Sequence, residues 1–282
     1  MAQPTAIRRV DPYWWLTVPL LVLLLGLYVY PVLNVLGVSV TDPELGLANY
    51  ALLFTNEGIQ NMLWVTVRIC VVTSVLTMLL GYVVAYAVVH VSDRQRLWML
   101  LFILIPFWVS VLIRSFSWLV LLRPEGIINN VLMAIGLISE PLDLVRNEIG
   151  VVIGMVHYML PIAILPLFAN MKGIDNRVVA AARGLGAGPF EAFWRIFLPL
   201  SLPGLAGSGL LVFIFSLGFF VTPAILGGGK TIMIAEYVSL QILNIVRWGT
   251  GTMLAVVLLA MVALLILAMS RVINVRETFG AK

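Results

Sequence analysis

The sequence predicts an all-α membrane protein with about six transmembrane helices. Of its 282 residues, 62% are hydrophobic and only 11% are charged, whereas soluble domains are about half apolar and a quarter charged. The apolar residues form runs of about 18 or more positions with few charges, the length that a helix needs to cross a bilayer. Because lipid offers no partner to backbone polar groups, we expect these runs to be helices.

Six apolar runs are the expected spans. They cover residues 14–40, 61–90, 97–122, 149–170, 203–226 and 250–273. Arg8 and Arg9 precede the first run, but no small-residue cleavage site follows it, so we expect an uncleaved span rather than a signal peptide. The expected organisation is therefore a tail over 1–13, a single membrane domain over 14–273 and a second tail over 274–282.

Charge predicts the orientation of the chain. Six spans place both termini on one side, and the loops on that side hold more bases than acids, while the opposite loops hold more acids than bases. The positive-inside rule then predicts that both termini are cytoplasmic. Two long outer loops, 123–148 and 227–249, each contain an apolar stretch, at 127–138 and 232–243. We expect each stretch to form a short helix on the membrane surface or under a docked partner.

The chain shows no sign of its own catalytic chemistry. Its single cysteine, Cys70, lies in an apolar run, so neither an intrachain disulfide nor a zinc or iron–sulfur site is predicted. Residues 227–231 look like a phosphate-binding loop, but Ala224 stands where that motif needs its first glycine, and a span precedes it. A glycine-rich turn is the better interpretation. With no nucleophile triad, paired catalytic carboxylates or metal-ligand spacing, we expect no cofactor and no metal in this chain.

The loop over 171–203 is the most informative segment. Asp175 can cap a helix whose first turns are residues 176–182, and a run of glycines then interrupts it. In the second helix Glu191 and Arg195 are four apart and can pair. The opposite face of that helix carries Phe190, Phe193, Trp194 and Phe197. The segment therefore predicts two helices on the cytoplasmic surface, the first slim enough to approach another protein closely.

This loop resembles the one that marks permeases of binding-protein-dependent ABC importers. That pattern reads Glu-Ala-Ala, three residues, Gly, nine residues, Ile, one residue, Leu-Pro. Its positions are matched here by Ala181, Ala182, Gly186, Ile196, Leu198 and Pro199. Ala180 replaces the leading Glu, which puts in doubt any polar contact that this Glu makes in relatives. Residues 105–118, 160–175 and 217–229 are in addition similar to the spermidine/putrescine-type branch.

The resemblance implies a fold, a place and partners. The fold is that of a type I ABC importer permease, a helical domain that dimerises in the bacterial cytoplasmic (inner) membrane. The implied partners are cytoplasmic ATPase subunits that carry ATP and Mg, a second permease that is a different chain or a copy, and a periplasmic or lipid-anchored solute-binding protein. The loop would dock on the ATPase as a coupling helix. Its docking residues would be Ala180, Ala181, Ala182, Arg183, Gly186 and Ala187.

Three ionisable residues inside the expected spans are candidates for the substrate path. Arg68, Arg114 and His157 are predicted at a similar depth, roughly 11–12 Å below the outer interface, and such groups often mark a pathway. Alternatively, the arginines snorkel outward or bond a neighbouring carbonyl, and His157 makes a packing hydrogen bond. Trp108 and Trp118 could hold an amine by cation–π contact or simply face lipid.

The substrate class stays open between two indications. The branch resemblance suggests a polyamine or a related amine, opine or phosphonate. However, all 13 Asp and Glu residues lie outside the expected spans, which favours a zwitterion or an anion. Two other classes of protein are possible alternatives. An ion-coupled secondary transporter would usually carry carboxylates inside its spans, and a membrane-embedded enzyme would need catalytic residues there.

Overall fold

The computed structural model describes residues 14–272, and nearly all of them are helical. The first half contains α1 (Trp14–Leu24), η1 (Leu25–Val29), α2 (Tyr30–Thr41), α3 (Ala48–Thr55), α4 (Glu57–His90), α5 (Asp93–Trp108), α6 (Val111–Leu122) and α7 (Ile127–Ala134). The second half contains α8 (Glu148–Lys172), α9 (Asn176–Gly184), α10 (Pro189–Ala192), η2 (Phe193–Phe197), α11 (Leu198–Leu217), α12 (Val221–Leu226), α13 (Ile234–Ser239), η3 (Leu240–Asn244) and α14 (Trp248–Val272). The three elements named η are short π-helical turns within longer helices. Both tails lie outside the described residues.

Five helices are long and apolar enough to cross a membrane. They are Trp14–Thr41, Glu57–His90, Glu148–Lys172, Pro189–Leu217 and Trp248–Arg271. A sixth crossing is formed if α5 and the helices after it count as one span, although they are bent by 97° at a short break. The all-α fold with about six spans is therefore confirmed.

Two spans differ from their predicted form. The third was expected to be continuous over 97–122, but it breaks at residues 109–110, one turn after Pro106. The fifth was expected at 203–226, but it begins at Pro189 and ends at Leu217. Proline is tolerated at a first helical turn, as at Pro189, and the π-turn η2 is the kind of local adjustment that lets a span continue past a proline such as Pro199, which follows it.

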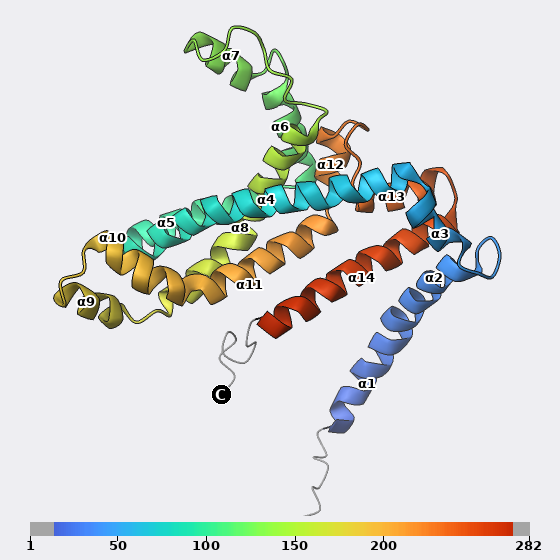
Figure 1. Cartoon of the computed structure of the whole chain (residues 1–282), viewed down its shortest axis with the longest axis horizontal. Coiled ribbons are helices and arrows are strands. Elements are labelled where there is room, and N and C mark those ends of the chain that lie inside the picture. The colour runs from blue at the N-terminus through green and yellow to red at the C-terminus, as the bar shows by residue number, and fades with distance from the viewer. Residues whose placement is uncertain (1–13, 273–282) are drawn as a thin grey trace, which may run out of the picture.

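The core of the bundle is built on α4 and α8. Figure 1 shows α4 running along the long axis of the molecule, with α8 and α11 beside it. A cluster of buried residues joins α4 and α8 to α11, α12 and the segment after α12; its members are Ile69, Cys70, Val151, Met155, Leu217, Leu226 and Met233. A Cβ on Gly154 would lie 2.5 Å from Leu226 Cδ1, so this glycine allows α8 and α12 to touch.

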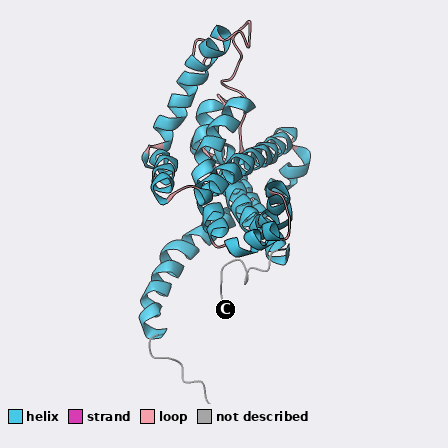
Figure 2. Cartoon of the chain, turned by 90° about the vertical axis from the view of Figure 1, so that its left-hand side faces the viewer, coloured by secondary structure: helices cyan, strands magenta, loops and turns pink. Residues whose placement is uncertain are grey.

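Two parts of the chain extend away from this bundle. In Figure 1, α1 leads off on one side, and α6 and α7 project from another; Figure 2 shows both projections after a quarter turn. No residue of α1 is buried. The short helices expected in both outer loops are present, as α7 and as α13 with η3. The segment α13 packs against α4, α12 and α14 rather than standing apart.

Candidate functional site

The helix α9 forms as the sequence predicts. The Asp175 carboxylate accepts a hydrogen bond from the backbone N–H of Arg177 (2.9 Å), which caps the first turn. The helix ends at Gly184, and Gly186 follows with φ = +98°, a conformation that side chains other than glycine rarely adopt. A Cβ on Gly186 would meet nothing within 4 Å, so this position requires glycine for its backbone angle and not for space.

The surface of α9 is open. Among the six docking residues that the resemblance implies, Ala182 and Ala187 are half-buried, and Ala180, Ala181, Arg183 and Gly186 are exposed. Leu185, between the helix and Gly186, is 91% exposed, a position that sequence reasoning did not single out. A single exposed leucine is common on a protein surface, so Leu185 extends the open face of α9 without marking an interaction site by itself.

The second helix of the loop also follows its prediction in part. Gly188 precedes α10, which starts at Pro189, and the Glu191–Arg195 ion pair forms at 2.9 Å. The four aromatic residues do not share one environment, because Phe197 is buried while Phe190 is exposed. The π-turn η2 shifts the helical register at these residues, which explains why a simple helical repeat misplaced them.

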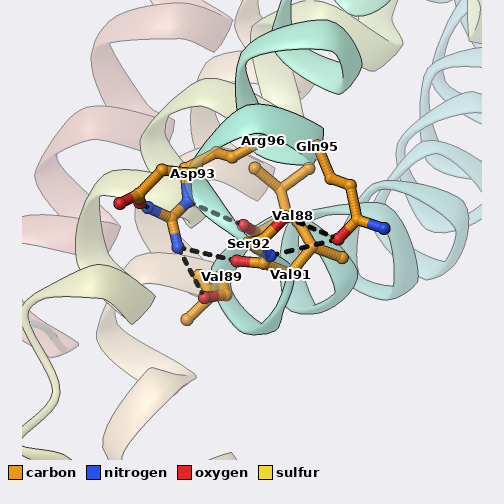
Figure 3. Close-up of polar contacts among 7 residues, drawn as sticks. All are labelled: Val88, Val89, Val91, Ser92, Asp93, Gln95 and Arg96. Atoms are coloured by element: carbon orange, nitrogen blue, oxygen red, sulfur yellow. Dashed lines mark hydrogen bonds and ion pairs between the residues drawn. The ribbon is translucent and has the colours of Figure 1, made fainter.

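The turn between α4 and α5 is held by one arginine, shown in Figure 3. The guanidinium of Arg96 donates to the backbone carbonyls of Val88 (3.0 Å), Val89 (3.1 Å) and Val91 (3.1 Å), and it pairs with Asp93. The last carbonyls of a helix have no partner within the helix, so Arg96 supplies one. Sequence reasoning counted this residue only as a positive charge near the membrane.

Three of the five path candidates come together where α6 meets α8. Arg114 is only 8% exposed, and its guanidinium carbon lies 4.8 Å from the centre of the Tyr158 ring. Its Nη2 donates to the Val109 carbonyl at 2.9 Å, across the break in the third span. One turn further along α6, Trp118 Nε1 donates to His157 Nδ1 at 3.1 Å.

Within the described part of the chain, Arg114 keeps unused bonding capacity. Its Nε and Nη1 atoms are buried and have no hydrogen-bond partner there. A buried cation that lacks partners is costly unless something else completes its shell. The hydrogen bond to the Val109 carbonyl is what a structural role for Arg114 predicts. The two unpaired nitrogens are what a role in the substrate path predicts.

The other two candidates lie apart from this group. Arg68 forms an ion pair with Glu148 in the first turn of α8, and both side chains are partly exposed. Its charge is therefore balanced by a residue 80 positions away. Trp108, the last residue of α5, is 91% exposed. Within the described residues its ring does not pack against the ring of Trp118 or His157, which pair with each other.

Glu236 is a buried carboxylate that sequence reasoning left without a role. It lies in α13, it is 7% exposed, and its Oε2 has no partner among the described residues. Burial raises the pKa of the Glu236 carboxyl to about 7, against the opposing effect of a backbone hydrogen bond at Met233. Together with Arg114 it makes up the buried charged residues of the described chain. The signal in the sequence was a lone acid inside an apolar stretch.

This raised pKa predicts a stability that falls as pH rises. The carboxyl binds its proton more tightly in the folded protein than in the unfolded one, so the free energy of unfolding decreases between pH 4.5 and about 7. The loss is about 3 kcal/mol at most. Glu236→Gln removes this titration. The Tm of the variant minus the Tm of the wild type should therefore be larger at pH 8 than at pH 5. Exposed Glu125 provides the control variant, Glu125→Gln, and an equal response from both would contradict this prediction.

The family follows from the chain as a whole. Residues 77–277 match the family described as "Binding-protein-dependent transport system inner membrane component". The chain belongs to this family. It is thus a permease subunit of an ABC importer, a multi-pass protein of the inner membrane, and not the ATPase, which is a separate subunit. Family membership decides against the secondary transporter and the membrane-embedded enzyme.

The permease has named relatives in the same branch. It is 34% identical over 218 residues to the spermidine/putrescine transport system permease protein PotB of Haemophilus influenzae, covering 77% of this chain and 76% of the relative. It is 29% identical over 212 residues to PotB of Escherichia coli K12, covering 74% of this chain and 77% of the relative. The expected membership of the spermidine/putrescine-type branch is confirmed.

The fold is also found in a solved structure. A chain of a bacterial ABC transporter, crystallised with a periplasmic protein that holds an alginate pentasaccharide, matches this permease with a TM-score of 0.76. The match covers 94% of this chain and 96% of the other at 17% identity, which supports the fold and not the substrate. The expected importer fold is confirmed. The described residues contain no group of three potential metal ligands.

Proposed function

We propose that this permease forms half of the translocation path for a small amine and that α9 couples it to the ATPase. The observation that carries the coupling role is the geometry of α9, a capped helix with small exposed side chains that ends at a left-handed glycine. ATP is handled by another subunit, so force must reach the permease through a protein contact. Ala180–Ala182, Arg183, Gly186 and Ala187 form that contact, with exposed Leu185 at its edge.

The orientation follows from the same proposal. The excess of bases on the side of the termini supports a cytoplasmic position for α9 and both tails, on the side where the ATPase binds its nucleotide and Mg. The opposite loops, 123–148 and 227–249, would then receive substrate from a solute-binding protein. A variant of α9 that loses the ATPase tests the orientation and the docking site together.

Two features support an amine as the cargo. PotB relatives at 29–34% identity are named for spermidine and putrescine transport. The buried carboxylate of Glu236, in the outer segment α13, is an acid that can pair with an ammonium group. Arg114 and His157 line the path beside Trp118 and Tyr158 in this proposal, while Arg68 and Trp108 lie further from it.

Uptake by the reconstituted complex tests the function. The permease is assembled in liposomes with its ATPase, its second permease and its solute-binding protein, and labelled putrescine is supplied outside. We expect uptake that requires ATP inside the liposomes and that a tenfold excess of spermidine suppresses. An opine and a phosphonate serve as competitors of other classes. Suppression by the phosphonate and not by spermidine would overturn the amine assignment, and uptake without ATP would overturn the whole proposal.

A further inference from the structure

A cluster of aromatic rings connects the loop after α9 to the end of α4. Tyr86 of α4 lies edge-on to Phe193 (5.4 Å between ring centres) and to Phe197 (5.1 Å), both on η2. The same ring packs on His90 at 4.2 Å. One turn away on α4, the Tyr82 hydroxyl is 2.8 Å from the Ser201 hydroxyl. Rings in such edge-to-face contacts are constrained in both distance and direction, so they transmit displacement.

The same cluster reaches the coupling helix. Val179 of α9 and Ile174 before it pack against the buried group that includes Phe197 and Ala85. Arg96 holds the carbonyls at the end of α4, which prevents this end from fraying. The cytoplasmic end of α4 is therefore fixed on one side by rings and on the other by a hydrogen-bonded arginine.

The helix α4 is the unbroken connection from this cluster to the other side of the bundle. It runs for 34 residues without a proline or a π-turn, a length of about 51 Å. The first span contains η1, the third is broken, α8 contains Pro161 and Pro166, and the fifth contains η2. The helix α14 is also free of prolines, but none of its residues packs in the cluster at the cytoplasmic end of α4. A helix without a kink moves as a rigid body, whereas a kinked one can absorb motion.

The far end of α4 is attached to the segment between α12 and α14. The Thr66 hydroxyl accepts a hydrogen bond from the backbone N–H of Ile234 (2.9 Å), within a fully buried contact. Ile59 and Met62 of α4 pack with Ile234 in a second buried cluster, which also includes Met253 of α14. Displacement of α4 at Tyr86 thus moves the outer segment that contains Glu236.

We propose that Tyr86 is a positioning residue that passes the movement of the coupling loop to α4, and that α4 passes it to the outer segment 227–247. The proposal rests on the docking of α9 to the ATPase and adds the route beyond it. In this proposal Tyr86 acts through the packing of its ring and not by binding nucleotide or cargo. In the described part of the chain the Tyr86 hydroxyl makes no hydrogen bond with another side chain. The contacts of Tyr86 with η2 are therefore made by its ring and not by its hydroxyl.

The test compares Tyr86→Ala with Tyr86→Phe in the full complex. For Tyr86→Ala we expect normal retention of the ATPase and normal basal ATP hydrolysis, with at least a fivefold loss of the stimulation caused by loaded solute-binding protein and a tenfold loss of uptake. Tyr86→Phe should behave as the wild type. The control variant is Phe102→Ala, which removes a ring from the exposed Trp98–Phe102 pair on α5.

A probe at the outer end of α4 reports the movement directly. A fluorophore on Gln60→Cys, an exposed position, should change its emission when vanadate traps the nucleotide, and Tyr86→Ala should abolish this change. A retained signal with normal uptake in Tyr86→Ala would overturn the proposal, and so would loss of the ATPase, because the cluster would then serve docking. Failure of the docking proposal would be seen in a separate experiment: variants of the docking residues of α9 would still co-purify with the ATPase.

Discussion

Substitution of Ala182 by Trp, or of Gly186 by Asp, detaches the ATPase from the permease while the spans still insert. Ala182 is half-buried on a surface of small side chains, and an indole there holds the partner away. Gly186 adopts φ = +98°, where a residue with a Cβ costs about 1–3 kcal/mol and shifts the chain that follows α9. The measurement is the amount of ATPase that co-purifies with each variant, followed by hydrolysis stimulated by the loaded solute-binding protein.

Gly184→Ala is the matched control for this experiment. Gly184 is the last residue of α9, it has no left-handed backbone angle, and a Cβ there meets nothing within 4 Å. Alanine favours a helix over glycine by about 1 kcal/mol, so this variant should keep its ATPase. Full retention and full stimulation for both Ala182→Trp and Gly186→Asp would mean that the ATPase docks elsewhere.

Replacement of Arg114 by Met lowers uptake by at least tenfold without loss of assembly. Methionine keeps the volume of the side chain and removes the charge, the bond to the Val109 carbonyl and the contact with the Tyr158 ring. Two guanidinium nitrogens that have no partner in the described part of the chain are then no longer available to the path. Uptake rate and apparent affinity are measured together, because a path residue changes affinity for cargo and a purely structural one changes the amount of active complex.

Arg114→Lys separates the charge from the geometry. Lysine keeps a cation beside Tyr158, but it lacks the planar guanidinium. A single ammonium cannot bond the Val109 carbonyl through one nitrogen and offer two other nitrogens to the path. We expect intermediate uptake for this variant and normal uptake for Arg94→Ala, which removes an exposed arginine from the first turn of α5. Normal transport by Arg114→Met would assign Arg114 to the structure of the break alone.

The spans and the helix α9 could be predicted because their causes are local. Apolar runs reveal a helix in lipid, and α9 is determined by Asp175 at its start and the glycines at its end. The start of the fifth span was harder, since the cytoplasmic loop was expected to reach residue 203, but the helix begins at Pro189 and the π-turn η2 continues it. Composition was enough to predict that a segment is helical. Where a helix begins and ends depended on local adjustments such as the π-turn η2, which the sequence does not reveal.

Contacts between distant residues could not be predicted from the sequence. Arg68 and Glu148 are 80 positions apart, so Arg68 was expected to be a charge inside a span, but its partner could not be identified. Glu236 was placed among the outer acids, because its burial depends on how α13 folds back against α4 and α14. Trp118 and His157 were each candidates, but only the packing of α6 on α8 makes them a pair.

The break in the third span has a consequence for what surrounds the permease. Irregular backbone at membrane depth is stable only where protein or water covers it, since hydrocarbon provides no hydrogen bonds. At residues 109–110 the chain leaves the helix, and Arg114 satisfies the Val109 carbonyl from inside the protein. Residues 107–110 are exposed in this subunit, so we expect a neighbouring subunit or water, and not acyl chains, to cover this corner. The lipid around the subunit would then be interrupted beside the group formed by Arg114, Trp118 and His157.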